Sequence, residues 1–111
     1  NFAGALPLWL SPVQVKVIPV NLAYENYVRQ VTERLQAAGV RAEADLRNET
    51  MGYKIREAQT QKIPYMLIVG QKEEASGTVS VRRRGQGDLG AEPLEAFIAR
   101  VTGEIASRRM D

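Results

Sequence analysis

The sequence predicts a single α/β domain whose first three strands run parallel. Short β-branched runs alternate with longer segments in which apolar residues recur at steps of three and four. The continuously apolar run from Tyr65 to Val69 is typical of a central parallel strand that is buried on both faces. The length of 111 residues, with 44% hydrophobic and 25% charged residues, suits one domain with one core.

The first strand and helix are predicted from residues 13–39. Residues 13–18 alternate and are rich in valine and isoleucine, which predicts a strand that Pro19 ends because proline cannot donate to a ladder. Asn21 is a suitable N-cap for a helix whose apolar face runs from residue 24 to residue 38. Gly39 follows at the place where a left-handed residue ends a helix.

A second strand and helix repeat this pattern. Residues 40–46 predict a strand, residues 51–62 predict a helix, and Pro64 closes the helix before the apolar strand at 65–69. Two successive strand–helix–strand crossovers should be right-handed, and they make these first three strands parallel.

The second half predicts a hairpin and a last helix. A short fourth strand that carries Glu73 is expected before the turn at residues 75–77, and residues 78–82 alternate again as a fifth strand. The hairpin makes the fourth strand antiparallel to the third. The last helix is expected to start near Pro93, with the order β-α-β-α-β-β-β-α for the whole chain.

The composition argues against catalysis within this chain. It has no cysteine and no histidine, which excludes disulfides, thiol nucleophiles, histidine triads and the usual zinc sites. The glycine fingerprints of nucleotide-binding loops are absent. We therefore expect no catalytic, cofactor-binding or metal-binding residues. The apolar runs are shorter than the ~20 residues of a membrane span, and the start lacks the basic region of a signal peptide, so we expect a cytoplasmic protein without membrane contact.

Two polar groups suggest chemistry only weakly. Residues 85–87, Gly-Gln-Gly, follow a strand in an arginine-rich stretch, and a mobile loop is favoured over a phosphate cradle. Glu43, Asp45 and Glu49 lie close in sequence, and a solvated strand end is favoured over a carboxylate site. Residues 1–12, which are rich in proline, glycine and large apolar side chains, fit either a linker that packs as it arrives or a free N-terminal arm.

The cations fall in two groups, although the net charge is only +2. On the strand at 78–82, Arg82 and Arg84 should project from one side, opposite to Val79 and Val81. This run fits an RNA contact, and it fits nearly as well a charged edge strand that blocks aggregation. The two groups are Arg41, Arg47, Lys54, Arg56 and Lys62, and then Arg82, Arg83 and Arg84.

The predicted hairpin places Glu73 beside Arg82. An acidic acceptor next to a guanidinium donor is the arrangement that reads a base edge. Spacing alone favours the simpler interpretation, which is a cross-strand salt bridge worth roughly 0.2–1 kcal/mol.

Several motifs are similar to the bacterial-type threonyl-tRNA synthetases. The most distinctive stretch is Ala44 to Ala58, whose Asp-Leu-Arg-Asn-Glu run at 45–49 is not shared by the related prolyl, histidyl and glycyl enzymes. Residues 7–15, 64–70 and 88–90 continue the similarity, so that it covers essentially the whole chain. The chain resembles the C-terminal anticodon-binding domain of that family.

The resemblance implies a fold and a domain division. The fold is a three-layer α/β/α domain with a mixed five-stranded sheet of order 2-1-3-4-5, in which strand 4 is antiparallel. Residues 1–12 would be the linker from a missing catalytic domain, and residues 13–111 the anticodon-binding domain. The parent enzyme would attach threonine to its tRNA and would bind ATP, Mg²⁺ and Zn²⁺ in that catalytic domain. The parent would be a homodimer, and this fragment alone a non-catalytic monomer.

The resemblance also implies a partner and a site. The partner is the anticodon loop of threonine tRNA, whose second and third anticodon bases are G and U. By position in the matching motifs, the base-reading residues fall on Asn48, Glu73 and Arg82. On weaker grounds, contacts to the RNA backbone or loop fall on Lys54, Arg56 and Arg84. The segment 83–87 departs from the commoner family patterns.

Two other classes of function remain as alternatives. One is a free-standing protein-interaction or accessory module on the same fold that uses the apolar N-terminal segment as its interface. The other is a small enzyme of the flavodoxin or dinucleotide-binding type, against which the missing glycine fingerprint and the lack of histidine argue.

Overall fold

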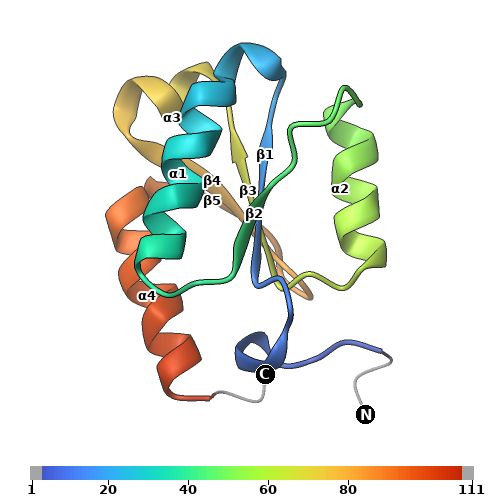
Figure 1. The fold of residues 1–111 in the computed structure, drawn as a ribbon, viewed down its shortest axis with the longest axis vertical. Helices are drawn as coiled ribbons and strands as arrows, with labels where there is room; N and C mark the ends of the chain where they lie inside the picture. Colours follow the sequence, from blue (N-terminus) through green and yellow to red (C-terminus); the bar gives the residue numbers. More distant parts are fainter. Residues whose placement is uncertain (1–3, 109–111) are drawn as a thin grey trace.

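The computed structural model describes residues 4–108, which form a five-stranded sheet with helices on both faces (Figure 1). The strands are β1 (Val15–Pro19), β2 (Ala42–Ala44), β3 (Tyr65–Val69), β4 (Thr78–Arg83) and β5 (Gly87–Pro93). The helices are α1 (Glu25–Ala37), α2 (Met51–Thr60), α3 (Gln71–Ser76) and α4 (Leu94–Ala106), with 3₁₀ turns η1 (Leu8–Leu10) and η2 (Leu22–Tyr24).

The sheet has the predicted order, β2-β1-β3-β4-β5. β1 is parallel to both β2 and β3, whereas β4 is antiparallel to both β3 and β5. The predicted α/β class, the parallel first three strands and a sheet whose fourth strand is antiparallel are therefore confirmed, although other residues than expected form that fourth strand.

The two faces of the sheet are covered unequally. On one face, α1 and α4 pack over β1, β3 and β4 around a large core that contains Tyr65, Leu67 and Phe97. On the other face α2 lies alone, and its Ala58 packs against Ile18 and Met66 (Figure 1). Because α2 packs mainly over β1 and β3, no described helix covers the α2 side of β4 and β5.

The predicted capping residues of the first half are confirmed, but β2 is shorter than predicted. The Asn21 side chain accepts a hydrogen bond from the Ala23 amide at 2.9 Å, and Gly39 has a φ of 88° beyond the end of α1. β2 is three residues long, not the predicted seven. One reason is that the Val40 amide donates to the Leu35 carbonyl at the end of α1 and so is not available to the sheet.

The structure corrects the prediction for residues 70–93. The expected short fourth strand is helix α3, which ends at Gly77 with a left-handed φ of 70°. The strand at Thr78–Arg83 is therefore β4, and its hairpin partner is β5. The 85–87 loop is a tight turn in which the Gln86 amide donates to the Arg83 carbonyl at 3.0 Å, with Gly85 and Gly87 at positive φ. We expected a mobile loop there and assigned no strand after it.

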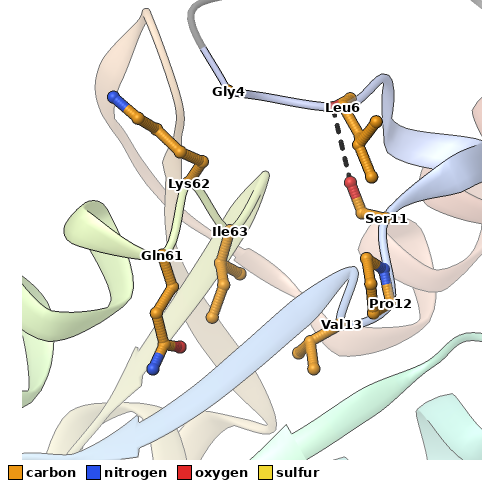
Figure 2. Close-up of a pocket in the computed structure, with 8 residues that line it drawn as sticks. All are labelled: Gly4, Leu6, Ser11, Pro12, Val13, Gln61, Lys62 and Ile63. Atoms are coloured by element: carbon orange, nitrogen blue, oxygen red, sulfur yellow. Dashed lines mark hydrogen bonds between the residues drawn. The ribbon is translucent and has the colours of Figure 1, made fainter.

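The described part of the N-terminal segment packs on the domain. The Gln14 side chain, fully buried, donates to the Leu8 carbonyl at 3.1 Å, and the Arg41 guanidinium donates to Trp9 and Ser11 carbonyls at 3.0 and 2.8 Å. Figure 2 shows this segment facing Lys62 and Ile63 across a hollow of about 230 Å³. For residues 4–12, a free arm is thus the wrong alternative.

Candidate nucleic-acid interface

The carboxyl ends of the parallel strands gather three loops at one edge of the sheet. The loop after β1 and the loop before α2 line an open hollow of about 520 Å³, and Asn48 lies on its wall. In open α/β sheets this edge is where ligands collect. Asn48 is exposed, and its amide makes no hydrogen bond to any residue between 4 and 108. Its donors and its acceptor are therefore free for a ligand.

A network of charges holds the loop that carries Asn48. Arg47 donates to both carboxylate oxygens of Asp45, at 2.9 and 2.7 Å, and to Glu57 on α2 at 2.6 Å. The Lys54 ammonium donates to the Asp45 carbonyl at 3.1 Å. Asp45 is 6% exposed and Lys54 is 2% exposed, so the network is anchored in the protein and keeps the loop in place. The predicted solvated strand end is thus wrong for Asp45.

This network makes the stability of the domain depend on pH. The hydrogen bond from Arg47 is the largest of the causes that lower the pKa of Asp45, against the effect of burial. A lowered folded-state pKa contributes stability that is present above the unfolded pKa of about 3.9 and is lost as the pH falls through the folded value. Asp45→Asn should therefore destabilise the domain at pH 7, and the difference from the unsubstituted protein should shrink towards pH 3.

Urea unfolding between pH 7 and pH 3 measures this difference. The matched control is Glu43→Gln on β2, just before Asp45, because Glu43 pairs with Lys16 at 2.8 Å while its side chain is 57% exposed, and exposed pairs contribute little. A constant difference between Asp45→Asn and the unsubstituted protein across this range would show that the Asp45 carboxylate is not the titrating group.

Glu73 also lies at the carboxyl edge, on the first turn of α3. Its Oε1 accepts a hydrogen bond from the Gly70 amide at 2.7 Å. The side chain is half-buried, and its Oε2 makes no hydrogen bond to the described residues. One carboxylate oxygen thus fixes the side chain, and the other stays available as an acceptor.

Arg82 lies elsewhere, and the predicted Glu73–Arg82 hairpin pair is wrong. Arg82 on β4 stands opposite Met66 on one side and Asp88 on the other. From Met66 to Gly70 the chain rises about 13 Å at about 3.3 Å per residue, and Glu73 follows beyond. The cause is that residues 71–76 form a helix instead of a strand. Glu73 and Arg82 therefore lie at separate points, and no salt bridge joins them in the described chain.

The side chain of Arg82 is on the α2 side of the sheet. Because Arg82 pairs with Met66, which packs under α2, it shares the face of Met66. It is half-buried, and with Arg84 it lines a hollow of about 220 Å³ near the end of α2. Within residues 4–108 it has no ion pair. Arg83 points to the other face, as alternation along the strand predicts, and bonds there to Tyr65 and Glu104.

The three predicted backbone contacts differ in their availability. Lys54 is buried with its ammonium engaged, and Arg84 donates to the carbonyls of Lys62 and Leu6 at 2.6 and 2.8 Å. An RNA contact by Lys54 or Arg84 would require breaking these hydrogen bonds to backbone carbonyls. Arg56 is exposed, and in the described chain it makes no ion pair. Of the three, Arg56 is the cation that faces solvent.

Three residues at this interface escaped the sequence analysis. Val20 and Leu22 are 45% and 40% exposed beside Asn48, although both are large and apolar. The sequence could have indicated their exposure, because Val20 and Leu22 flank the Asn21 N-cap and lie outside the apolar face of α1. Asp88 stands opposite Arg82 on β5, a strand that the sequence did not reveal.

The described residues offer neither a metal site nor a membrane span. No three carboxylates among residues 4–108 come together as metal ligands would. Within the same range every helix is too short or too polar to cross a bilayer.

Comparison with known proteins decides the family. A family model described as an anticodon binding domain matches residues 14–104. The chain belongs to the anticodon-binding domain family. The geometry of this anticodon-binding domain agrees with a crystal structure of the RNA binding domain of threonyl-tRNA synthetase from Cryptosporidium parvum Iowa II. The TM-score is 0.85 at 28% identity, over 98% of this chain and 26% of that one.

The sequence comparison narrows the type of anticodon-binding domain. The chain is 54% identical over 108 residues to a threonine–tRNA ligase of Syntrophomonas wolfei. This alignment covers 97% of the chain and 17% of the ligase. It is 52% identical over 111 residues to that of Thermus thermophilus, again 17% of the ligase. The domain is therefore of the threonyl-tRNA synthetase type, as the motifs indicated, and it spans about a sixth of the length of these relatives.

Proposed function

We propose that this domain binds the anticodon loop of threonine tRNA and is the recognition part of a threonine–tRNA ligase. The observation that carries the proposal is the identity above 50% with such ligases over nearly the whole chain. The geometry supports it, because Asn48 and Glu73 present unsatisfied polar atoms at the carboxyl edge of the parallel strands, and Arg82 presents its guanidinium on the α2 face of the sheet.

The parent protein follows from the same proposal. Residues 1–12 connect a catalytic domain to the anticodon-binding domain at 13–111, and the catalytic domain joins threonine to its tRNA with ATP and holds the Mg²⁺ and Zn²⁺. Leu6 and Leu10 in the connecting segment are each 45% exposed, which suits a segment that contacts that neighbouring domain. The parent is a cytoplasmic homodimer that dimerises mainly through its catalytic part.

The proposed mechanism uses two separate points on the surface. Unpaired bases are splayed out of the loop, as in most sequence-specific RNA recognition. At one point Arg82 donates to the acceptor edge of the second base, G, which is the commonest pairing between arginine and a base. At the other, Asn48 and the free oxygen of Glu73 meet the edge of the third base, U, whose ring N–H is a donor.

A comparison of two RNAs tests this function. One stem-loop carries the threonine anticodon, and the other has both the G and the U replaced by other bases. Fluorescence anisotropy at 150 mM salt should show a preference of at least tenfold for the first, because both base contacts are lost in the second RNA and each discriminates by about 1–3 kcal/mol. Equal affinity for the two RNAs would refute anticodon recognition by this chain.

Arg56 is predicted to contact phosphate and not a base. Arg56→Ala should reduce the slope of log K against log salt by about 1, because one fewer counterion is released, while the preference between the two stem-loops stays the same. The control is Arg29→Ala on α1, on the opposite face of the sheet, which should leave the slope unchanged. A changed base preference in Arg56→Ala would mean that this residue reads a base.

A further inference from the structure

We propose that the hollow between the loop after β1 and the loop before α2 holds a single unstacked nucleobase, with Val20 and Leu22 as its apolar floor. The proposal rests on the proposed function and adds to it. It assigns a binding role to two aliphatic side chains that are not among the polar residues expected to read bases.

The lining of the hollow combines an apolar surface with polar groups. Val20 and Leu22 are large aliphatic residues that remain 45% and 40% exposed in loops that are mostly polar. A nucleobase has flat apolar faces and a polar edge, so it fits a surface of this kind, whereas a phosphate or a sugar does not. The hollow has a volume of about 520 Å³ and is lined by Val20, Asn21, Leu22, Asn48, Glu49, Thr50 and Met51.

Polar atoms stand on both sides of Val20. On one side is the free amide of Asn48, across the hollow. On the other is Glu73, because a Cβ placed on Gly70 would lie 2.8 Å from Val20 Cγ2 and 3.5 Å from Glu73 Oε1. A base that lies on Val20 would therefore meet the Asn48 amide at its edge, while Glu73 lies near Val20 without lining the hollow.

The site is held in shape before any ligand arrives. The Val20 amide donates to the Val69 carbonyl at 2.9 Å, which ties the loop to the end of β3. The absence of a side chain at Gly70 lets Val20 come close to β3. The Arg47–Asp45 pair fixes the loop that carries Asn48. A rigid site costs less entropy on binding, which suits the capture of a mobile, unpaired base.

Loss of the apolar floor tests the proposal. Leu22→Ser should weaken binding of the threonine stem-loop by roughly three- to tenfold, the effect expected from a partly buried leucine side chain. The matched control is Leu10→Ser, a leucine of similar exposure (45%) in η1 before β1, which should bind like the unsubstituted chain. Leu22 lies exposed in a 3₁₀ turn, so its replacement leaves the core intact.

Stem-loops that lack one base show which nucleotide is involved. Three RNAs each carry an abasic nucleotide at one anticodon position. For one of them Leu22→Ser and the unsubstituted chain should bind within twofold of each other, because the base that the floor supports is missing. For the other two the loss should remain. A second variant, Gly70→Ala, should lose no affinity for the same one of the three abasic RNAs, because the added methyl displaces Val20.

The outcomes separate this inference from the proposed function. Suppose that the unsubstituted chain prefers the threonine stem-loop, but that Leu22→Ser and Gly70→Ala bind every RNA with the same affinity as the unsubstituted chain. The apolar floor is then refuted, and the proposed function stands. An equal loss for all three abasic RNAs also refutes it, because the floor would then support no particular base. If the unsubstituted chain does not distinguish the stem-loops at all, both proposals fall.

Discussion

Replacement of Glu104 by alanine is expected to lower the free energy of unfolding by about 3–5 kcal/mol, the cost of breaking a buried ion pair. Glu104 on α4 and Arg83 on β4 have side chains only 8% and 11% exposed. Glu104 Oε1 accepts from the Tyr65 hydroxyl at 2.8 Å and from Arg83 at 3.2 Å. Without this carboxylate, the Arg83 guanidinium keeps its contacts with the hydroxyl and the ring of Tyr65 but loses the ion pair that helps offset its desolvation.

A neighbouring pair on the same helix provides the control. Glu95 on α4 also pairs with an arginine, Arg34, but its side chain is 66% exposed. Glu95→Ala should cost less than about 1 kcal/mol, as exposed ion pairs usually do. Urea unfolding at pH 7 measures both variants, and a loss below about 1 kcal/mol for Glu104→Ala would contradict the assigned role of the buried pair.

The buried pair matters for the interface because it sets the orientation of β4. Successive side chains of a strand point to opposite faces, so the inward position of Arg83 places Arg82 on the other face. Tyr65 stands opposite Arg83 in the register, and Met66 opposite Arg82. The pair thus fixes which of the two arginines stands on the α2 face of the sheet.

Arg82→Ala should weaken binding of the threonine stem-loop by about 1–3 kcal/mol, if the magnitude for arginine contacts to bases in DNA applies to RNA. Arg82 has no ion pair among the described residues, so its removal from the free protein breaks no salt bridge there. The loss therefore reports on the RNA contact. Anisotropy titration at fixed salt measures it, because charge contacts vary steeply with salt.

The control for Arg82 is an arginine that is already paired. Arg100 on α4 donates to both carboxylate oxygens of Glu92 at 2.7 and 2.8 Å, on the face opposite to α2. Arg100→Ala removes the same formal charge and should leave RNA affinity within twofold. Equal binding by Arg82→Ala and the unsubstituted chain would exclude Arg82 from recognition.

Most of the fold could be predicted because local patterns and tertiary structure agree. The apolar run of β3, the apolar face of α1 and Gly39 each act in the structure as their sequence indicates. Residues 87–93 gave no such indication, because the single large apolar side chain, Leu89, is 44% exposed and no β-branched residue is present. Pairing with β4 makes this segment a strand, and sequence alone does not show that pairing.

The missed helix α3 has a different cause. Six residues are too few for a helical period to emerge, so the sequence predicts a short strand at Glu73 and Glu74 before a turn. The relevant signal was local: Glu73 lies three residues after Gly70 and bonds back to its amide, as residues at the start of a helix do.

The candidate site was predictable only in part. Spacing alone favoured a salt bridge between Glu73 and Arg82, and only the motif resemblance pointed to Asn48 and to base reading. The burial of Lys54 ran against expectation, because lysine is almost never fully buried unless it is paired. Its partner is a backbone carbonyl, that of Asp45, which no side-chain pattern in the sequence reveals.

The central claim is that two separate points on this domain read two different anticodon bases. The most direct test titrates the unsubstituted chain, Arg82→Ala and Asn48→Ala with the threonine stem-loop and with stem-loops changed singly at the second or third base. The account predicts that Arg82→Ala loses discrimination at the second base and keeps it at the third, and that Asn48→Ala does the reverse. Loss at both bases in each variant, or at neither, would contradict it.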